Sequence, residues 1–141
     1  MTVKPRIAII DDDTLLLERL AANLPDDVIT HCFSDVAEFL QYMELKPELD
    51  AIFVDLNLPD VQGVAWQLGG LSVIQKIRNE TPGKAPCLCV FTGMDRVVHI
   101  STCLKNGADA FIEKSPDVRD MASQILLMSM HKPERAMRIG A

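Results

Sequence analysis

The sequence lacks long hydrophobic runs, and this absence argues against a membrane protein. No stretch reaches the roughly 18 consecutive apolar residues of a membrane-spanning helix. The first residues, MTVKPRIAIIDD, also lack the long apolar segment of a secretory signal peptide. We therefore expect no membrane segment and a cytoplasmic location.

The sequence also lacks paired cysteines, clustered histidines and an excess of basic residues. The four cysteines form no Cys-x-x-Cys pair, and the three histidines are scattered, so no zinc site or nucleophile–base pair is indicated. Cys87 and Cys89 lie in an apolar run and are most simply core residues. The net charge of −6 argues against direct binding of nucleic acid by this chain.

Five short apolar runs are present, and they have the character of strands in a parallel sheet. The chain of 141 residues is 48% hydrophobic and 24% charged, which suits one globular domain with a buried core. Continuous apolar runs are typical of parallel strands covered on both faces. The second run contains Thr30 and His31, so we expect it at an edge of the sheet. The runs are residues 6–10, 28–33, 51–54, 87–91 and 110–112.

Amphipathic segments separate these runs and predict five helices. Ser34 and Ser115 are suitable N-caps. Pro116 suits the first position of a helix, and Gly107 suits a C-cap. The alternation of strand and helix predicts an α/β fold, a doubly wound five-stranded parallel sheet with five helices in three α/β/α layers. The expected helices are residues 14–24, 34–45, 71–80, 95–107 and 115–130.

Polar residues follow the expected strands at their carboxyl ends. Asp11 and Asp12 follow the first strand and Asp55 follows the third. Thr92 follows the fourth, and Lys114 follows the fifth. Ligands of open α/β sheets bind at this edge.

The acids at this edge predict a bound cation, because two carboxylates about 4–5 Å apart repel by roughly 4 kcal/mol at an effective dielectric constant near 20. Hard oxygen ligands suit Mg²⁺, and a neighbouring ammonium and hydroxyl suit a phosphoryl group.

These motifs as a set resemble the receiver domain of response regulators, the phospho-acceptor module of two-component signalling. They are the acid pair after the first strand, FVDLNLPD after the third, VFTG after the fourth and FIEK at the fifth. The resemblance extends from about residue 6 to about residue 130. It implies a flavodoxin-like sheet with strand order 2-1-3-4-5. We expect a receiver domain over residues 1–131, followed at 132–141 by a tail or the start of a linker.

The resemblance implies a role for each residue of the acidic group. Asp55 would be phosphorylated by a histidine kinase, a histidine phosphotransfer protein or a small phosphodonor. Asp12 would bind Mg²⁺ directly and Asp11 would bind it through water. Asp55 and the backbone carbonyl of Asn57 would supply further ligands. Such a domain is a Mg²⁺-dependent phospho-acceptor with self-catalysed phosphorylation and dephosphorylation, and it is not a turnover enzyme.

The resemblance also implies a switch. Lys114 would pair with the phosphoryl oxygens, Thr92 would hydrogen-bond one of them, and Gly93 would leave room for the donor. Phe111 occupies the aromatic switch position, which turns inward when Thr92 moves toward the phosphate. The face formed by residues 95–130 would then change its contacts with an effector or a second copy.

The sequence departs from the family pattern at two places. Ser115 stands where the family has proline after the active-site lysine, which leaves a cis or trans Lys114–Ser115 bond open. Gly63 and Gly70 both match the spacing of the family glycine, so residues 64–70, VAWQLGG, are predicted to be an inserted loop. Trp66 in this loop either covers apolar surface beside the helix at 71–80 or stays partly exposed as a partner contact.

Two other functions are compatible with parts of the sequence. IIDDDTLL resembles the first motif of haloacid dehalogenase-like phosphohydrolases, with Asp11 as nucleophile and Asp13 as acid–base. That assignment leaves FVDLNLP unexplained. A receiver-like binding module without phosphorylation is the other alternative, although such modules usually lose one of the acids or the lysine. The cognate kinase, the output and the oligomeric state do not follow from the sequence.

Overall fold

Strands and helices alternate along the whole described chain. The computed structural model describes residues 4–58, 69–80, 86–93 and 97–130. Trp66, most of the expected insertion, the start of the helix expected at 95–107, and the tail at 132–141 lie outside these residues. In chain order the elements are β1 (Arg6–Ile10), α1 (Thr14–Asn23), β2 (Ile29–Phe33), α2 (Val36–Met43), β3 (Ala51–Asp55), α3 (Gly69–Glu80), β4 (Cys87–Thr92), α4 (Val97–Lys105), β5 (Ala110–Glu113) and α5 (Val118–Met130).

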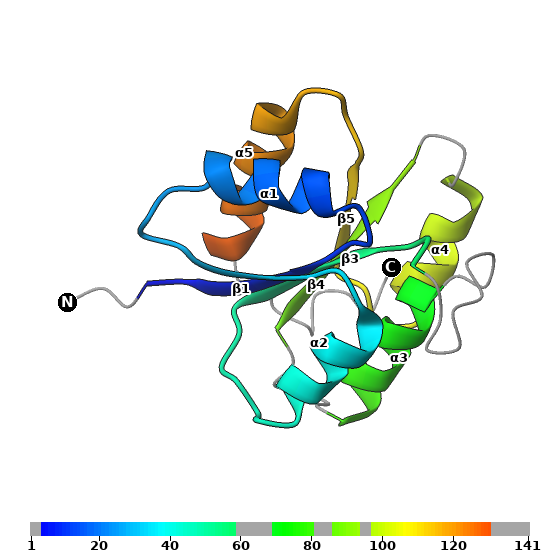
Figure 1. The fold of residues 1–141 in the computed structure, drawn as a ribbon. Helices are drawn as coiled ribbons and strands as arrows, with labels where there is room; N and C mark the ends of the chain where they lie inside the picture. The colour runs from blue at the N-terminus through cyan, green and yellow to red at the C-terminus, as the bar shows by residue number, and fades with distance from the viewer. Residues whose placement is uncertain (1–3, 59–68, 81–85, 94–96, 131–141) are drawn as a thin grey trace.

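The strands form one parallel sheet in the order β2-β1-β3-β4-β5, so the predicted fold class and topology are confirmed. β2 lies at an edge, as its polar residues predicted. Helices α1 and α5 cover one face of the sheet, and α2, α3 and α4 cover the other (Figure 1). Among the described helices, none is long and apolar enough to cross a membrane.

The core is divided by the sheet into two layers. In β1, Ala8 and Ile10 pack toward α2 and α3, whereas Ile7 and Ile9 pack toward α1 and α5. All four are buried because side chains alternate between two covered faces. The cysteines of β4 are buried core residues, as the sequence predicted, and they belong to the second layer.

The N-caps differ from the predicted ones. Ser34 was expected to cap the second helix, but Asp35 is the N-cap and its Oδ1 accepts from the N–H of Ala37 at 3.1 Å. The fifth helix begins at Val118 rather than at Ser115. There Asp117 Oδ1 accepts from the N–H of Arg119 at 3.0 Å, so Pro116 lies before the helix. A carboxylate both accepts this hydrogen bond and interacts favourably with the helix dipole, which a hydroxyl does not.

The C-terminus of α4 agrees with the predicted glycine cap. Gly107 has a φ of 119°, a left-handed conformation that glycine adopts without strain. Its N–H donates to the carbonyl of Leu104, and the N–H of Ala108 donates to the carbonyl of Cys103. This pair of hydrogen bonds is the Schellman arrangement, which ends the helix and turns the chain into β5.

Candidate functional site

Three acidic residues and one lysine meet at the carboxyl end of the sheet. Asp11 follows β1, Asp55 is the last residue of β3, and Lys114 follows β5. Lys114 Nζ lies 3.0 Å from Asp11 Oδ2 and 3.4 Å from Asp55 Oδ1. One carboxylate oxygen from each of Asp11, Asp12 and Asp55 lies within 4.8 Å of the other two. The structure thus brings together four of the residues that the sequence placed at this edge.

Backbone N–H groups orient two of these carboxylates. Asp11 Oδ1 accepts from the N–H of Asp13 at 2.9 Å, and Asp55 Oδ1 accepts from the N–H of Asn57 at 3.2 Å. In both cases the short side chain bonds to the backbone two residues later, which holds the carboxylate in a tight turn. The side chain of Asp13 serves another purpose, because its Oδ1 caps α1 through the N–H of Leu16 at 3.1 Å.

Burial makes the two inner carboxylates difficult to ionise. Asp11 and Asp55 are buried, whereas Asp12 is exposed. Burial and then the charge of Asp55 raise the pKa of Asp11 to about 6, against the opposing effects of the Asp13 N–H and Lys114. Burial likewise raises the pKa of Asp55, although Lys114 and the N–H of Asn57 lower it. The site therefore carries an electrostatic cost that a cation would relieve.

Lys114 cannot balance this group by itself. Burial lowers the pKa of Lys114, but the charges of Asp55 and Asp11 outweigh burial and raise it, so the ammonium stays charged. One positive charge then faces three carboxylates. Asp11 Oδ2 is buried and accepts no well-aligned hydrogen bond from the described residues, its contact being the Lys114 ammonium. Several oxygen donors around a charge deficit fit a hard divalent cation such as Mg²⁺.

Two of the other predicted residues lie at or near the same edge, and one lies outside the described residues. Thr92 is the last residue of β4 and pairs with Glu113 of β5, which places its backbone beside Lys114. Phe111 is on β5, and its side chain is 45% exposed. The third of these predicted residues, Trp66, lies outside the described residues. The Lys114–Ser115 peptide bond is trans.

Gly70 is a site residue whose contact the sequence did not reveal. It lies in the first turn of α3, so the last two residues of the expected insertion are helical. A Cβ at Gly70 would overlap the carbonyl oxygen of Asp55 and would lie 2.8 Å from Cα of Leu56. Only glycine allows the helix to approach the end of β3 this closely. In the sequence, Gly70 matched the family spacing to the end of this helix, whereas Gly63 matched the family spacing from the Leu-Pro pair after the third strand. These two matches left the choice between the glycines open.

The chain is similar to known receiver domains. The family model described as response regulator receiver domain matches residues 7–126. A CheY-like receiver domain protein from Methanospirillum hungatei JF-1 has 25% sequence identity and a TM-score of 0.70, over 89% of this chain and 93% of that chain. The signal receiver domain of an HD domain-containing protein from Pseudomonas fluorescens Pf-5 has 21% identity and a TM-score of 0.73, over 98% of this chain and 94% of that chain.

Full-length FixJ from B. japonicum has 21% identity and a TM-score of 0.71, over 90% of this chain and 58% of that chain. The two likenesses at 21% identity show the fold alone. No curated protein matches the chain. Since the family model covers most of the sequence and the sheet has the same topology, the chain belongs to the response regulator receiver domain family.

Proposed function

We propose that this receiver domain accepts a phosphoryl group on Asp55 in a two-component phosphorelay. The observation that carries the proposal is the position of this carboxylate. It is buried at the carboxyl end of the central strand, 3.4 Å from the Lys114 ammonium and within 4.8 Å of two further carboxylates. The donors are a histidine kinase or a histidine phosphotransfer protein, in keeping with the family.

In the proposed reaction, an oxygen of Asp55 attacks the phosphorus of a phosphohistidine. The new O–P bond forms an acyl phosphate while the P–N bond breaks, and the leaving imidazole nitrogen takes up a proton. Both described donors to Asp55, Lys114 Nζ and the N–H of Asn57, meet Oδ1, which leaves Oδ2 to attack. The Lys114 ammonium then faces the oxygens of the transferred group and offsets their charge.

The ligands proposed for Mg²⁺ are Asp12 directly, Asp11 through water, Asp55, and the backbone carbonyl of Asn57. When bound, the ion supplies positive charge that offsets the repulsion between the carboxylates and the phosphoryl group. The raised pKa values of Asp11 and Asp55 support this assignment, because burial disfavours the charged form of each carboxylate by more than Lys114 favours it, and a cation at the site would offset that cost.

The proposed output is a change of the face formed by residues 95–130. Thr92 and Phe111 are the proposed switch residues, and the Phe111 side chain is partly exposed on β5 in this structure. Phosphorylation would draw Thr92 toward the phosphate and allow Phe111 to turn inward. The changed face would bind an effector or a second copy. The domain is a cytoplasmic signalling module in this proposal and has no turnover activity.

A phosphohydrolase with Asp11 as nucleophile is less well supported. Its acid–base residue would be Asp13, whose carboxylate is exposed and caps α1 through the N–H of Leu16. A side chain held in that way points along the helix start rather than toward Asp11. A non-phosphorylated binding module would not need the cluster of three acids and the lysine that this chain has.

The first experiment locates the acyl phosphate. The chain is incubated with acetyl phosphate and Mg²⁺, and the added phosphate is measured by intact mass and peptide mapping. We expect one phosphate on Asp55, lost in Asp55→Asn and when Mg²⁺ is chelated, with Asp13→Asn as the control that keeps it. Phosphate on Asp11, or undiminished phosphate on Asp55→Asn, would contradict the proposal.

The second experiment tests the metal ligands. Asp12→Ala is expected to weaken Mg²⁺ binding far more than Asp13→Ala, because only Asp12 belongs to the oxygen cluster. Isothermal titration calorimetry with Mg²⁺ measures both variants against the wild type. An equal loss of Mg²⁺ affinity in the two variants would mean that the roles of Asp12 and Asp13 are assigned wrongly.

A further inference from the structure

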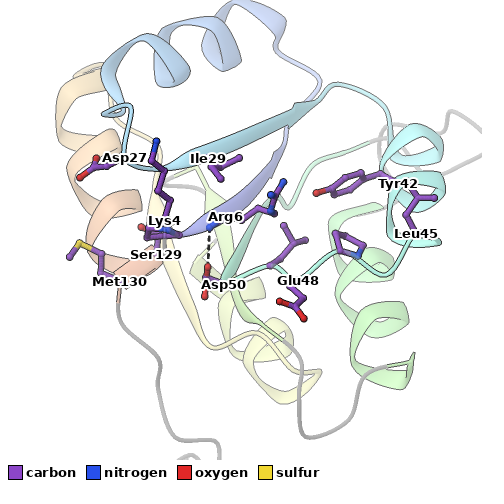
Figure 2. Close-up of a pocket in the computed structure, with 13 residues that line it drawn as sticks. Lys4, Arg6, Asp27, Ile29, Tyr42, Leu45, Glu48, Asp50, Ser129 and Met130 are labelled. Carbon is purple, nitrogen blue, oxygen red and sulfur yellow. Dashed lines mark hydrogen bonds between the residues drawn. The ribbon is translucent and has the colours of Figure 1, made fainter. Parts of the chain in front are cut away.

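A groove lies at the amino end of the sheet, opposite to the acidic site. Its volume is about 1240 Å³. Figure 2 shows the residues that line it. The floor includes Arg6 and Ile29, which begin β1 and β2. Leu45, after α2, lies at one end, and Met130, the last residue of α5, lies at the other. The groove therefore runs from the C-terminus of the last helix across the sheet to α2.

The groove combines exposed apolar side chains with acids. Leu45 is 78% exposed and Met130 is 68% exposed. Asp27 and Glu48 are exposed on its rim. These features suit a segment that carries both apolar and basic side chains.

Two basic residues, Lys4 and Arg6, also line the groove, but they do not neutralise its acids. Arg6 is already engaged, because its Nη1 lies 2.9 Å from Nε2 of His31 and its backbone N–H donates to Asp50 Oδ2. Lys4 is exposed and lies at the Met130 side of the groove (Figure 2). Among the ion pairs of the described residues, none involves Asp27 or Glu48, so both carboxylates remain available to basic side chains that arrive from solvent.

The chain itself contains a segment of this composition at the correct place. Residues 131–141, HKPERAMRIGA, continue directly from Met130 at one end of the groove. They include three basic residues and one acidic residue, whereas the whole chain has a net charge of −6. Eleven residues reach roughly 35 Å when extended, which is long enough to cross a small domain. Attachment to α5 also gives the segment a high effective concentration at the groove.

We propose that residues 131–141 bind in this groove of the same chain. The basic side chains lie against the carboxylates of Asp27 and Glu48, and the apolar ones lie against Leu45. This interaction is separate from the phosphorylation proposed above and does not depend on Asp55.

Paramagnetic relaxation tests the proposal on the chain of residues 1–141. A nitroxide label is attached to Ala141→Cys in a Cys32→Ser background, because Cys32 is exposed and the other three cysteines are buried. We expect the label to broaden the amide NMR signals of Ile29 and Leu49, which line the groove. The broadening should be independent of protein concentration, and it should weaken as salt screens the charges.

Charge reversal provides the decisive comparison. Asp27→Lys combined with Glu48→Lys should abolish the broadening, and both positions are exposed, so the fold is retained. Glu18→Lys, an exposed acid on α1 that does not line the groove, should leave it unchanged. Absence of broadening at the groove would overturn the proposal. Broadening that grows with protein concentration, which indicates a second copy, or that survives the double reversal would also overturn it.

Discussion

Asp11 has the least favourable electrostatic position among the side chains of the site. Its carboxylate is buried, lies beside Asp55 and shares one lysine with it. Its pKa of about 6 lies above the ordinary value of 3.8, first because of burial and then because of the charge of Asp55. In the absence of a metal ion, the charged form of Asp11 therefore lowers the stability of the folded chain near neutral pH.

We predict that Asp11→Asn stabilises the metal-free chain at pH 7.5 by roughly 2–3 kcal/mol. The folded state binds this proton more tightly than the unfolded state. The stabilising contribution of protonation is therefore complete below pH 3.8 and is lost as the pH rises through about 6. Urea unfolding in a chelator at several pH values measures the effect.

The advantage of Asp11→Asn should accordingly shrink as the pH falls from 7.5 to 4. Asp26→Asn, an exposed acid in the loop after α1, is the control and should change stability by no more than about 0.5 kcal/mol. An advantage of Asp11→Asn that is the same at pH 4 and pH 7.5 would show that its cause is not the ionisation of Asp11.

At the scale of elements, α3 is attached to the rest of the domain at both ends. Its first turn packs through Gly70 against the backbone of Asp55. Near its last turn, Arg78 Nη2 lies 2.6 Å from Asp109 Oδ2, and Arg78 Nε donates to the carbonyl of Gly107 at 2.7 Å. The helix therefore connects the proposed acceptor strand with the turn between α4 and β5.

We predict that Gly70→Ala destabilises the chain by about 1–3 kcal/mol and slows phosphorylation of Asp55. The new Cβ would meet backbone atoms of Asp55 and Leu56, which cannot rotate away as a flexible side chain can. This cost exceeds the gain of about 1 kcal/mol in helix propensity. Denaturant unfolding and the rate of phosphorylation by acetyl phosphate measure the two effects.

Ser72→Ala is the matched control for Gly70→Ala, because Ser72 lies in the same helix and is exposed. It should leave both stability and phosphorylation close to the wild type. If Gly70→Ala were as stable and as reactive as Ser72→Ala, the close approach of α3 to β3 would have no consequence for the site.

We predict that Arg78→Ala destabilises the chain by about 3–5 kcal/mol, because it leaves the buried carboxylate of Asp109 without the guanidinium. The two side chains are 12% and 2% exposed, respectively. Lys76→Ala on the same helix breaks the exposed pair with Glu80 and should have a much smaller effect, since water screens that pair. Denaturant unfolding compares the two variants, and equal losses would contradict the special role of Arg78.

At the scale of the whole molecule, the two ends of the sheet have different chemistry. The acid group and Lys114 lie at the carboxyl end, and the groove beside Met130 lies at the amino end. Helix α5 reaches from one end to the other, since it follows Lys114 and ends at Met130. The face that carries β5 and α5 is therefore joined directly to the proposed phosphoryl site.

We predict that Mg²⁺ with beryllofluoride, a phosphoryl analogue, changes amide hydrogen exchange across α4, β5 and α5. A ligand shifts a conformational equilibrium only by its different affinity for the two states, so the change should be partial and reversible. Exchange in α2 should change less, and Asp55→Asn should show no response. Unchanged exchange across residues 97–130 would contradict the proposed switch.

The sequence by itself determined the elements, the fold class and the position of the acids. Continuous apolar runs are typical of strands covered on both faces, and the alternation with amphipathic helices predicts a parallel sheet. In such a sheet the carboxyl ends of all strands lie at one edge, so residues that follow different strands meet there. For that reason the positions of Asp11, Asp55 and Lys114 along the chain were enough to group them at one edge.

The tertiary structure alone decided which atoms approach one another across that edge. Sequence spacing allowed either Gly63 or Gly70 as the family glycine; Gly63 lies outside the described residues, and the structure shows that Gly70 packs against the backbone of Asp55. The capping carboxylates, Asp35 and Asp117, replaced the predicted serines because the local turn determines which side chain reaches the free N–H groups. The groove is formed by segments far apart in the chain, and no local pattern encodes it. Such features depend on distances between elements, whereas periodicity and spacing describe only the chain within each element.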